Sequence, residues 1–300
     1  MKGYKGFNKD MTCKGKQYAE NTVFEEDKAE ICLSGMHFCE NPLDVLDYYP
    51  LIDDNCDMNE FAEVEALDEV KTGDNKKYCT KKLKIGAKLS PSAFIKAAID
   101  FVFEKSEEVN ESNSAKLASS GYSAQLASSG DYAKLASSGD FAQLASSGDF
   151  AQLASSGDYA KLASSGYSAQ LASSGDYAKL ASSGNSAQLA SSGYSAQLAS
   201  SGDSAKLASS GNSAQLASSG NYARLASSGK HSVVAGIGVD NIAKGKKGSW
   251  LVLAEWVFDY EKGRYIPKYV KSKKIDGKTL KEDTFYQLKD GKFVEVRNEK

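Results

Sequence analysis

The stretch ASSGDYAKLASSGDFAQLASSGDFAQLASSGDYAKLASSG, residues 127–166, repeats one short phrase four times. Extended in both directions it becomes thirteen consecutive nonapeptides without an insertion, from Ala115 to His231, of the form A-[KQR]-L-A-S-S-G-[DNYK]-[YSFH]. A weaker copy follows, with Val234, Ala235 and Gly238 in phase. A fixed period held over 117 residues indicates a repeat architecture, in which each unit stacks on its neighbours.

Each repeat predicts a short strand followed by a tight turn. Ala and Leu alternate with Lys or Gln, as in a strand with one buried face. Ser-Ser-Gly-Asp favours a turn in which Gly, and often the Asp or Asn after it, takes a positive φ. An amphipathic helix would need apolar residues near a 3.6-residue period, which this repeat lacks. The abundance of Ser and Gly leaves disorder as an alternative, but a Leu at the third position of every repeat favours a packed core.

Nine residues are too few to enclose a core, so we expect two nonapeptides per coil, with three per coil as the alternative. The predicted fold is mainly β: a parallel β-solenoid of 13–14 nonapeptide repeats over residues 112–240, with about 6.5 coils in the clear repeats. Its interior would hold the leucines from Leu117 to Leu225. Stacked repeats leave open ends that need covers.

The flanking segments are expected to supply those covers. Residues 1–89 predict a small α+β N-terminal module, with strands at 61–67 and 81–89. Residues 90–111 predict a capping helix, with Ser90 as N-cap and Pro91 at its first position. Its apolar face would be Phe94, Ile95, Ala98, Phe101 and Val102. Residues 241–300 predict a β-rich C-terminal cap with turns such as 289–292.

The net charge of −2 conceals a gradient along the chain. Residues 1–114 carry 15 basic and 23 acidic side chains, residues 115–231 carry 7 and 6, and residues 232–300 carry 15 and 10. Homo-oligomers formed through the acidic N-terminal and basic C-terminal modules are therefore one expectation. No apolar h-region follows Met1 and no run of 18 apolar residues occurs, so we expect a cytoplasmic protein with no membrane contact.

Residues able to carry chemistry are few. His37 and His231 are the two histidines, and no P-loop, GxSxG, HExxH or CxxC motif is present. We therefore expect no enzymatic activity and no cofactor. All five cysteines lie in the first 80 residues, where buried free thiols are expected. Cys32, His37 and Cys39 are close enough in sequence to be weak candidates for metal ligands.

Three motifs carry a resemblance to a known but uncharacterised family of bacterial, phage and prophage proteins. They are KGF at residues 5–7, GMHFCENP at residues 35–42 and GSWLVLAEW at residues 248–256. The resemblance covers essentially the whole chain and implies an accessory protein of a mobile element, acting in the host cytoplasm. It brings no established activity.

Two repeat families resemble the nonapeptides locally. The calcium-binding β-roll of secreted toxins also closes two nonapeptides per coil, but its calcium aspartate falls on Ala133, so no calcium is expected. Pentapeptide-repeat proteins, some of which mimic DNA, share the look of A-K-L-A-S without its period of five. The repeats sum to +1, whereas a mimic should be strongly negative. DNA mimicry is thus a weaker alternative, and nucleic acid a less expected partner.

The N-terminal module also shows a fainter likeness to ADP-ribosyltransferases. Residues 35–39, GMHFC, and residues 43–49, LDVLDYY, resemble the strand and the tyrosine-bearing helix of that family. The resemblance implies an alternative function, nucleotide chemistry, with a glutamate between residues 60 and 69 as the catalytic carboxylate.

Variation within the repeats is confined to the two positions after Gly and the one after the first Ala. With two repeats per coil, alternate repeats stack, so rings and carboxylates would form a stripe beside lysines of the strands, with Tyr132 and Phe150 on the opposite face. The alternative to a binding surface is that the stacked rings only stabilise the exterior of the solenoid. The favoured function is a non-enzymatic binding or scaffold protein for a host or phage protein, in its sharpest form one that inhibits or sequesters a host defence protein. The predicted binding residues are Asp140, Phe141, Asp158, Tyr159, Lys161, Asp176, Tyr177 and Lys179.

Overall fold

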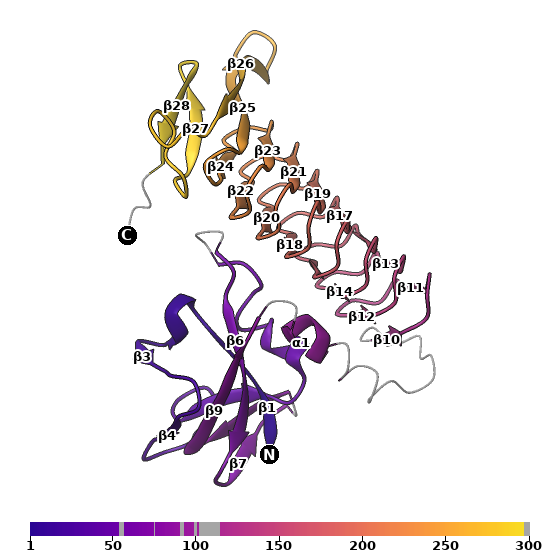
Figure 1. Cartoon of the computed structure of the whole chain (residues 1–300), viewed down its shortest axis with the longest axis vertical. Helices are drawn as coiled ribbons and strands as arrows, with labels where there is room; N and C mark the ends of the chain where they lie inside the picture. Colours follow the sequence, from indigo (N-terminus) through magenta and orange to yellow (C-terminus); the bar gives the residue numbers. More distant parts are fainter. Residues whose placement is uncertain (54–56, 75, 91–92, 99–100, 102–114, 297–300) are drawn as a thin grey trace. The chain divides into compact units, whose positions relative to one another are not determined.

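The computed structural model describes residues 1–53, 57–74, 76–90, 93–98, 101 and 115–296. The chain divides into two compact units, Met1–Lys105 and Ser106–Lys300. We call the first the N-terminal module. The second holds the solenoid and the C-terminal strands, drawn from magenta to yellow in Figure 1.

A seven-stranded antiparallel sheet forms the N-terminal module over its described residues, in the order β4-β9-β6-β1-β5-β8-β7. The predicted strands at 61–67 and 81–89 are confirmed as β6 and β9. Phe7, Met36, Phe38, Val64 and Ile85 belong to its core. The elements are β1 (Lys2–Phe7), η1 (Lys9–Met11), β2 (Thr12–Cys13), β3 (Lys16–Gln17), β4 (Val23–Glu25), β5 (Met36–Cys39), α1 (Pro42–Val45), β6 (Glu60–Ala66), β7 (Val70–Thr72), β8 (Lys77–Thr80) and β9 (Lys82–Leu89).

A helix follows this sheet at residues 93–98. Ser90 caps it as predicted, because its hydroxyl accepts a hydrogen bond from the Ala93 N–H at 3.2 Å. The ring of Phe94 stacks on that of Phe61 in β6, with centroids 4.0 Å apart. The described part of the helix therefore packs on the sheet of the N-terminal module. Residues 91–92, 99–100 and 102–111 of the predicted capping helix lie outside the described residues.

The solenoid strands stack 18 residues apart, which confirms two nonapeptides per coil. Lys116 aligns with Lys134, and Gln125 with Gln143, in parallel register. Over residues 115–296 each of two sheets contains eight parallel strands. The coil thus has more turns than the 6.5 or so expected from the clear repeats, because β24 and β25 continue it through Leu253.

The strands alternate between the two sheets along the chain. The first solenoid sheet contains β10 (Lys116–Ser119), β12 (Lys134–Ser137), β14 (Gln152–Ser155), β16 (Gln170–Ser173), β18 (Gln188–Ser191), β20 (Lys206–Ser209), β22 (Arg224–Ser227) and β24 (Ile242–Lys244). The second contains β11 (Gln125–Ser128), β13 (Gln143–Ser146), β15 (Lys161–Ser164), β17 (Lys179–Ser182), β19 (Gln197–Ser200), β21 (Gln215–Ser218), β23 (Val233–Gly236) and β25 (Trp250–Asp259).

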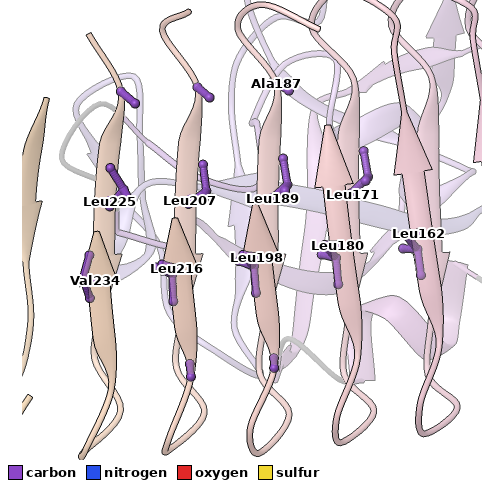
Figure 2. Close-up of a cluster of buried hydrophobic side chains, with 14 of the residues drawn as sticks. Leu162, Leu171, Leu180, Ala187, Leu189, Leu198, Leu207, Leu216, Leu225 and Val234 are labelled. Atoms are coloured by element: carbon purple, nitrogen blue, oxygen red, sulfur yellow. The ribbon is translucent and has the colours of Figure 1, made fainter. Parts of the chain in front are cut away.

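Leucine and alanine fill the interior of the coil. Figure 2 shows one column of leucines from each sheet, with Val234 continuing one of them. From Leu135 to Leu225 every repeat leucine is at most 1% exposed, and the first alanine of each repeat from Ala133 to Ala223 is fully buried. Leu117 and Leu126, in the first coil, are only partly buried. Each enclosed leucine contributes about 1.5–3 kcal/mol of transfer free energy, so the interior coils are the more stable part.

The repeat glycine is required by the close approach of neighbouring coils. A Cβ on Gly175 would lie 2.0 Å from the carbonyl oxygen of Gly157, one coil earlier, and the same overlap recurs from Gly139 to Gly238. The positive φ expected at this glycine or the residue after it was wrongly placed. It occurs at the second residue after Gly, from Ser123 to Asp240, with φ of 52–60°. That residue points outward and has room for a side chain, whereas the glycine has none.

The C-terminal strands extend both solenoid sheets. β26 (Arg264–Lys274) pairs with β25, while β27 (Tyr286–Lys289) and β28 (Lys292–Glu295) form a hairpin beside β24. Asp290 and Gly291 both have positive φ, as a two-residue hairpin turn requires. The predicted β-rich end and its turn at 289–292 are confirmed. Within the described ranges, no helix has the length and apolar character needed to cross a membrane.

Candidate functional site

The eight residues predicted to bind a partner lie along one edge and the outer face of the second solenoid sheet. Each Asp-aromatic pair occupies the corner that leads into a strand: 140–141 before β13, 158–159 before β15 and 176–177 before β17. Lys161 and Lys179 begin β15 and β17 and lie in register. All eight are exposed, so the structure brings the predicted stripe together.

The rings along this edge form a continuous stack. Phe141 and Tyr159 lie with centroids 5.0 Å apart and planes 4° apart, and Tyr159 and Tyr177 at 4.9 Å and 9°. Tyr122 extends the stack at one end, at 5.2 Å, and Tyr194 at the other, at 5.8 Å and nearly perpendicular. We call these five the long aromatic ladder. Its two end members escaped prediction because they occupy the first corner position rather than the second.

A second, shorter stack follows the opposite edge. Tyr132 and Phe150 are parallel, with centroids 5.1 Å apart, and Tyr167 meets Phe150 edge-on at 5.9 Å. We call these three the short aromatic ladder. It covers fewer coils than the long one.

The corner carboxylates hydrogen-bond to the backbone of the next coil. The Oδ1 atom of Asp140 accepts from the N–H of Asp158 at 2.9 Å, and Oδ1 of Asp158 accepts from Asp176 at 2.7 Å. Asn185 and Asn212 do the same for residues 203 and 230. An amide oxygen replaces a carboxylate oxygen as acceptor, which explains why Asp and Asn both occur at this position. These acids therefore have a structural role as well as an exposed charge.

The rings are not needed to close the corners. Serine occupies the same left-handed position at six corners between residues 115 and 240: 123, 168, 186, 195, 204 and 213. The N–H of this residue donates to a carbonyl of the next coil whether it is Tyr, as at 132, or Ser, as at 186. The five rings of the long aromatic ladder are nevertheless 41–73% exposed. They add apolar surface that the backbone does not require.

A shallow groove of about 1010 Å³ runs along the second solenoid sheet at the C-terminal ends of its strands, away from the long aromatic ladder. Alanine and serine side chains line it from Ala127 to Ser219, and it ends at Ala235 and Ile237. The second solenoid sheet thus presents three parallel rows: rings and carboxylates, then Gln or Lys, then small side chains.

The weak metal candidates of the N-terminal module do not form a ligand set. The Nε2 atom of His37 accepts a hydrogen bond from the backbone N–H of Cys32 at 3.0 Å, and Cys39 is buried in β5. Among the residues that the structure describes, no three His, Cys, Asp or Glu side chains gather as metal ligands would. Of the four described cysteines, none of which forms a disulfide, Cys13, Cys39 and Cys79 are buried and Cys32 is exposed; Cys56 lies outside the described residues.

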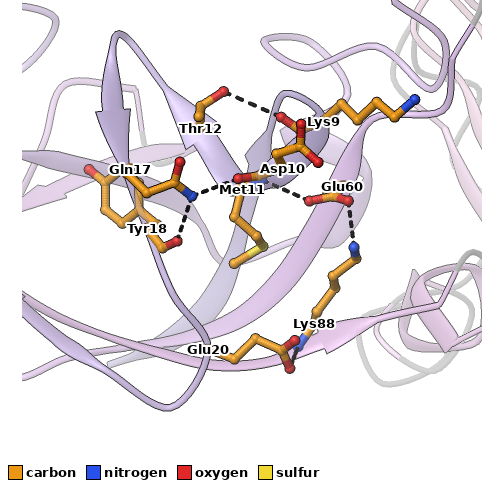
Figure 3. A network of polar contacts seen from close by, with 9 residues as sticks. All are labelled: Lys9, Asp10, Met11, Thr12, Gln17, Tyr18, Glu20, Glu60 and Lys88. Carbon is orange, nitrogen blue, oxygen red and sulfur yellow. Dashed lines mark hydrogen bonds and ion pairs between the residues drawn. The ribbon is translucent and has the colours of Figure 1, made fainter.

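One glutamate of the 60–69 segment, Glu60, is held in a structural network (Figure 3). Its carboxylate accepts a hydrogen bond from the Met11 N–H at 2.8 Å and pairs with the Lys88 ammonium group. It thereby joins η1, β6 and β9. The tyrosine-bearing helix expected at residues 43–49 is the single turn α1. Tyr48 and Tyr49 follow its end.

Comparison with known proteins gives information on the N-terminal module alone. No curated protein and no solved structure matches the chain. Residues 1–97 match the family model of a domain of unknown function, DUF7666.

Proposed function

We propose that this protein acts without catalysis, by holding another protein against the long aromatic ladder of the solenoid. The observation that carries the proposal is the run of exposed rings at corners that serine closes equally well. Exposed aromatic surface on a rigid support is typical of protein interfaces, where aromatic side chains supply much of the affinity.

The charges beside the ladder define the chemistry of the partner. Asp140, Asp158 and Asp176 form an acidic row next to the rings, and Lys161 and Lys179 form a short basic row on the strands. A fitting partner presents an apolar strip with basic groups on one side and carboxylates on the other. The rings would supply affinity, whereas these exposed charges would set orientation and the rate of association.

A host or phage protein in the cytoplasm is the partner that we propose, and its inhibition or sequestration is the consequence. The resemblance of residues 5–7, 35–42 and 248–256 to motifs of phage and prophage proteins supports this proposed origin. The rod lends itself to sequestration, because an extended surface can engage a partner over several coils.

The decisive experiment compares two triple variants of the full chain. Phe141, Tyr159 and Tyr177 are replaced by Ser in one, and Tyr132, Phe150 and Tyr222 by Ser in the matched control. Serine already occurs with the same positive φ at other corners of the coil. The circular dichroism of both variants should therefore be unchanged. A partner captured from host cells by the unaltered chain is identified by mass spectrometry, and its Kd is then measured with all three proteins.

Loss of the three long-ladder rings should weaken binding at least 100-fold, equivalent to about 3 kcal/mol. The control should bind within about threefold of the unaltered chain. Equal affinity for the two variants would overturn the proposal. If the captured protein is a second copy of this chain, and salt abolishes the association, the acidic N-terminal and basic C-terminal modules form the interface instead.

A further inference from the structure

The N-terminal module contains a pocket that the proposed binding function leaves unused. Its volume is about 600 Å³, within the range of small-molecule sites. Side chains from β1, β2, β3, β5 and the segment after α1 line it, all within the one module. Those used below are Lys5, Tyr18, Glu26, His37, Tyr48 and Tyr49.

Lys5 is the unusual member of this lining. It shares the inward face of β1 with Gly3 and Phe7 and is only 4% exposed. Its Nζ atom donates to the carbonyl oxygen of His37 at 2.9 Å, and the thiols of Cys13 and Cys39 and the carboxylate of Glu26 also interact with its charge. Burial lowers the pKa of Lys5. The carboxylate that acts on Lys5, Glu26, forms its ion pair with Lys16 instead, so the buried ammonium group of Lys5 is only partly compensated, which is costly.

The pocket carries an excess of positive charge. Lys14, Lys16 and Lys77 line it together with Lys5, against the carboxylates of Glu26 and Asp47. Lys16 is already paired with Glu26 at 2.8 Å. His37 responds to this environment: burial, and then the charges of Lys5, Lys14 and Lys77, lower its pKa to about 4. A neutral His37 at physiological pH leaves the cationic character to the lysines.

Tyrosine rings form flat surfaces beside these cations. Tyr48 is 42% exposed, and the Nζ atom of Lys77 lies 4.3 Å from its ring centroid. The ring of Tyr18 lies 5.4 Å from the Nζ atom of Lys5 and 5.5 Å from that of Lys16. Tyr49 donates its hydroxyl to the Cys13 sulfur at 2.9 Å, which fixes that ring in the wall. The pocket lining therefore combines cationic groups with aromatic rings at short range.

We propose that this pocket binds a small molecule that joins a flat ring to an anionic group, a phosphate or a carboxylate. The anion pairs with Lys5 and adds to the partial compensation from Glu26, and the ring packs against the tyrosine walls. This activity belongs to the N-terminal module and is independent of partner capture by the solenoid.

Titration of the full chain by calorimetry and ligand-observed NMR tests this proposal with four probes. AMP joins a ring to a phosphate and 4-hydroxyphenylacetate joins a ring to a carboxylate, while adenosine and inorganic phosphate each supply one half. At least one complete probe should bind about tenfold more tightly than either half. AMP alone would assign the anion as phosphate, and 4-hydroxyphenylacetate alone as carboxylate. Failure of both complete probes to saturate would overturn the proposal.

Two variants locate the site. Lys5→Met should weaken the complete probe at least tenfold and keep the fold, because Met matches the length of the stem and removes a buried charge. Lys81→Met, at an exposed lysine outside the pocket, is the matched control and should bind normally. Should Lys5→Met fail to fold, Tyr48→Ala, at an exposed ring, serves instead and should weaken the complete probes but not inorganic phosphate. Unchanged affinity in a folded Lys5→Met or Tyr48→Ala variant would contradict the assignment.

Discussion

The N-terminal module and the solenoid build β-structure by opposite routes. In the module the core mixes many kinds of side chain, such as Phe7, Met36 and Ile85, brought together from segments distant in sequence. In the repeats of the solenoid, the Leu, Ala and Ser of each strand pair with identical residues one coil apart, as with Leu135 and Leu153. Unlike neighbours leave room for a pocket, whereas identical neighbours give an even rod on which only rows of exposed side chains can vary. The two proposals follow this difference: a small molecule for the pocket of the module and a protein for the rows of the solenoid.

The largest effect should follow from adding one methyl group to the solenoid. Gly175→Ala places a Cβ about 2.0 Å from the Gly157 oxygen, so neighbouring coils must separate. We expect a loss of about 3 kcal/mol or more in the free energy of unfolding, measured by urea denaturation.

The module offers the matched control for this change. At Gly73 the nearest atom to an added Cβ is the Ile31 Cγ2 at 3.9 Å, so Gly73→Ala should change stability by less than about 0.5 kcal/mol. Equal losses in the two variants would show that close approach is not what the repeat glycine provides.

The next largest effect should be a difference between the two units in how much free energy of unfolding each loses at low pH. The pKa of His37 falls from 6.5 to about 4 on folding, so its contribution to stability is complete above pH 6.5 and is lost as the pH drops toward 4. Allowing for partial exposure, the module should lose about 1–2 kcal/mol over that window.

Amide resonances of each unit, followed through urea titrations at pH 7 and pH 5, measure this loss separately. Residues 115–230 contain no histidine and should change little. His37→Gln removes the titrating group, so the module of this variant should lose its extra sensitivity. A module that weakens to the same extent with glutamine would exclude His37 as the cause.

The smallest effect concerns the corner carboxylates. Asp158→Ala removes the acceptor for the Asp176 N–H and should cost about 1 kcal/mol. Asp158→Asn keeps an Oδ1 acceptor, as at Asn185, and should be nearly neutral. Denaturation midpoints of the two variants provide the comparison. Equal destabilisation would mean that the charge, rather than the hydrogen bond, stabilises the corner.

Much of the solenoid could be predicted because its period carries the information. Leu at the third position of every repeat gives the core, and nine residues, too few to close a coil, favour two repeats per turn over the alternative of three. The conformation of the corner could not be predicted in the same way. The residue with positive φ is Ser, Tyr, Phe, His or Asp in different coils, so no single residue type reveals it. The invariant glycine reflects the approach of another coil, which local sequence does not show.

The candidate sites divide along the same line. The alignment of Phe141, Tyr159 and Tyr177 in one row follows from the repeat period. The pocket of the N-terminal module, in contrast, is lined by several separate segments. One local signal did exist: Lys5 alternates in phase with Gly3 and Phe7 in β1, the pattern of an inward-facing residue. Its burial depends on Cys13, Tyr18 and the backbone of His37, which come from three other segments and surround it. A short motif around Lys5 does not predict contacts of that kind.

The 18-residue coil also sets the unit by which such a gene can lengthen or shorten. Nearly identical repeats favour unequal recombination, and loss of two repeats would leave every later strand in its own sheet. Loss of a single nonapeptide within the array would move every later strand to the opposite sheet and divide the long aromatic ladder between two edges. Selection on the ladder should therefore permit changes of repeat number in pairs, so the array length is expected to vary among variants in steps of two.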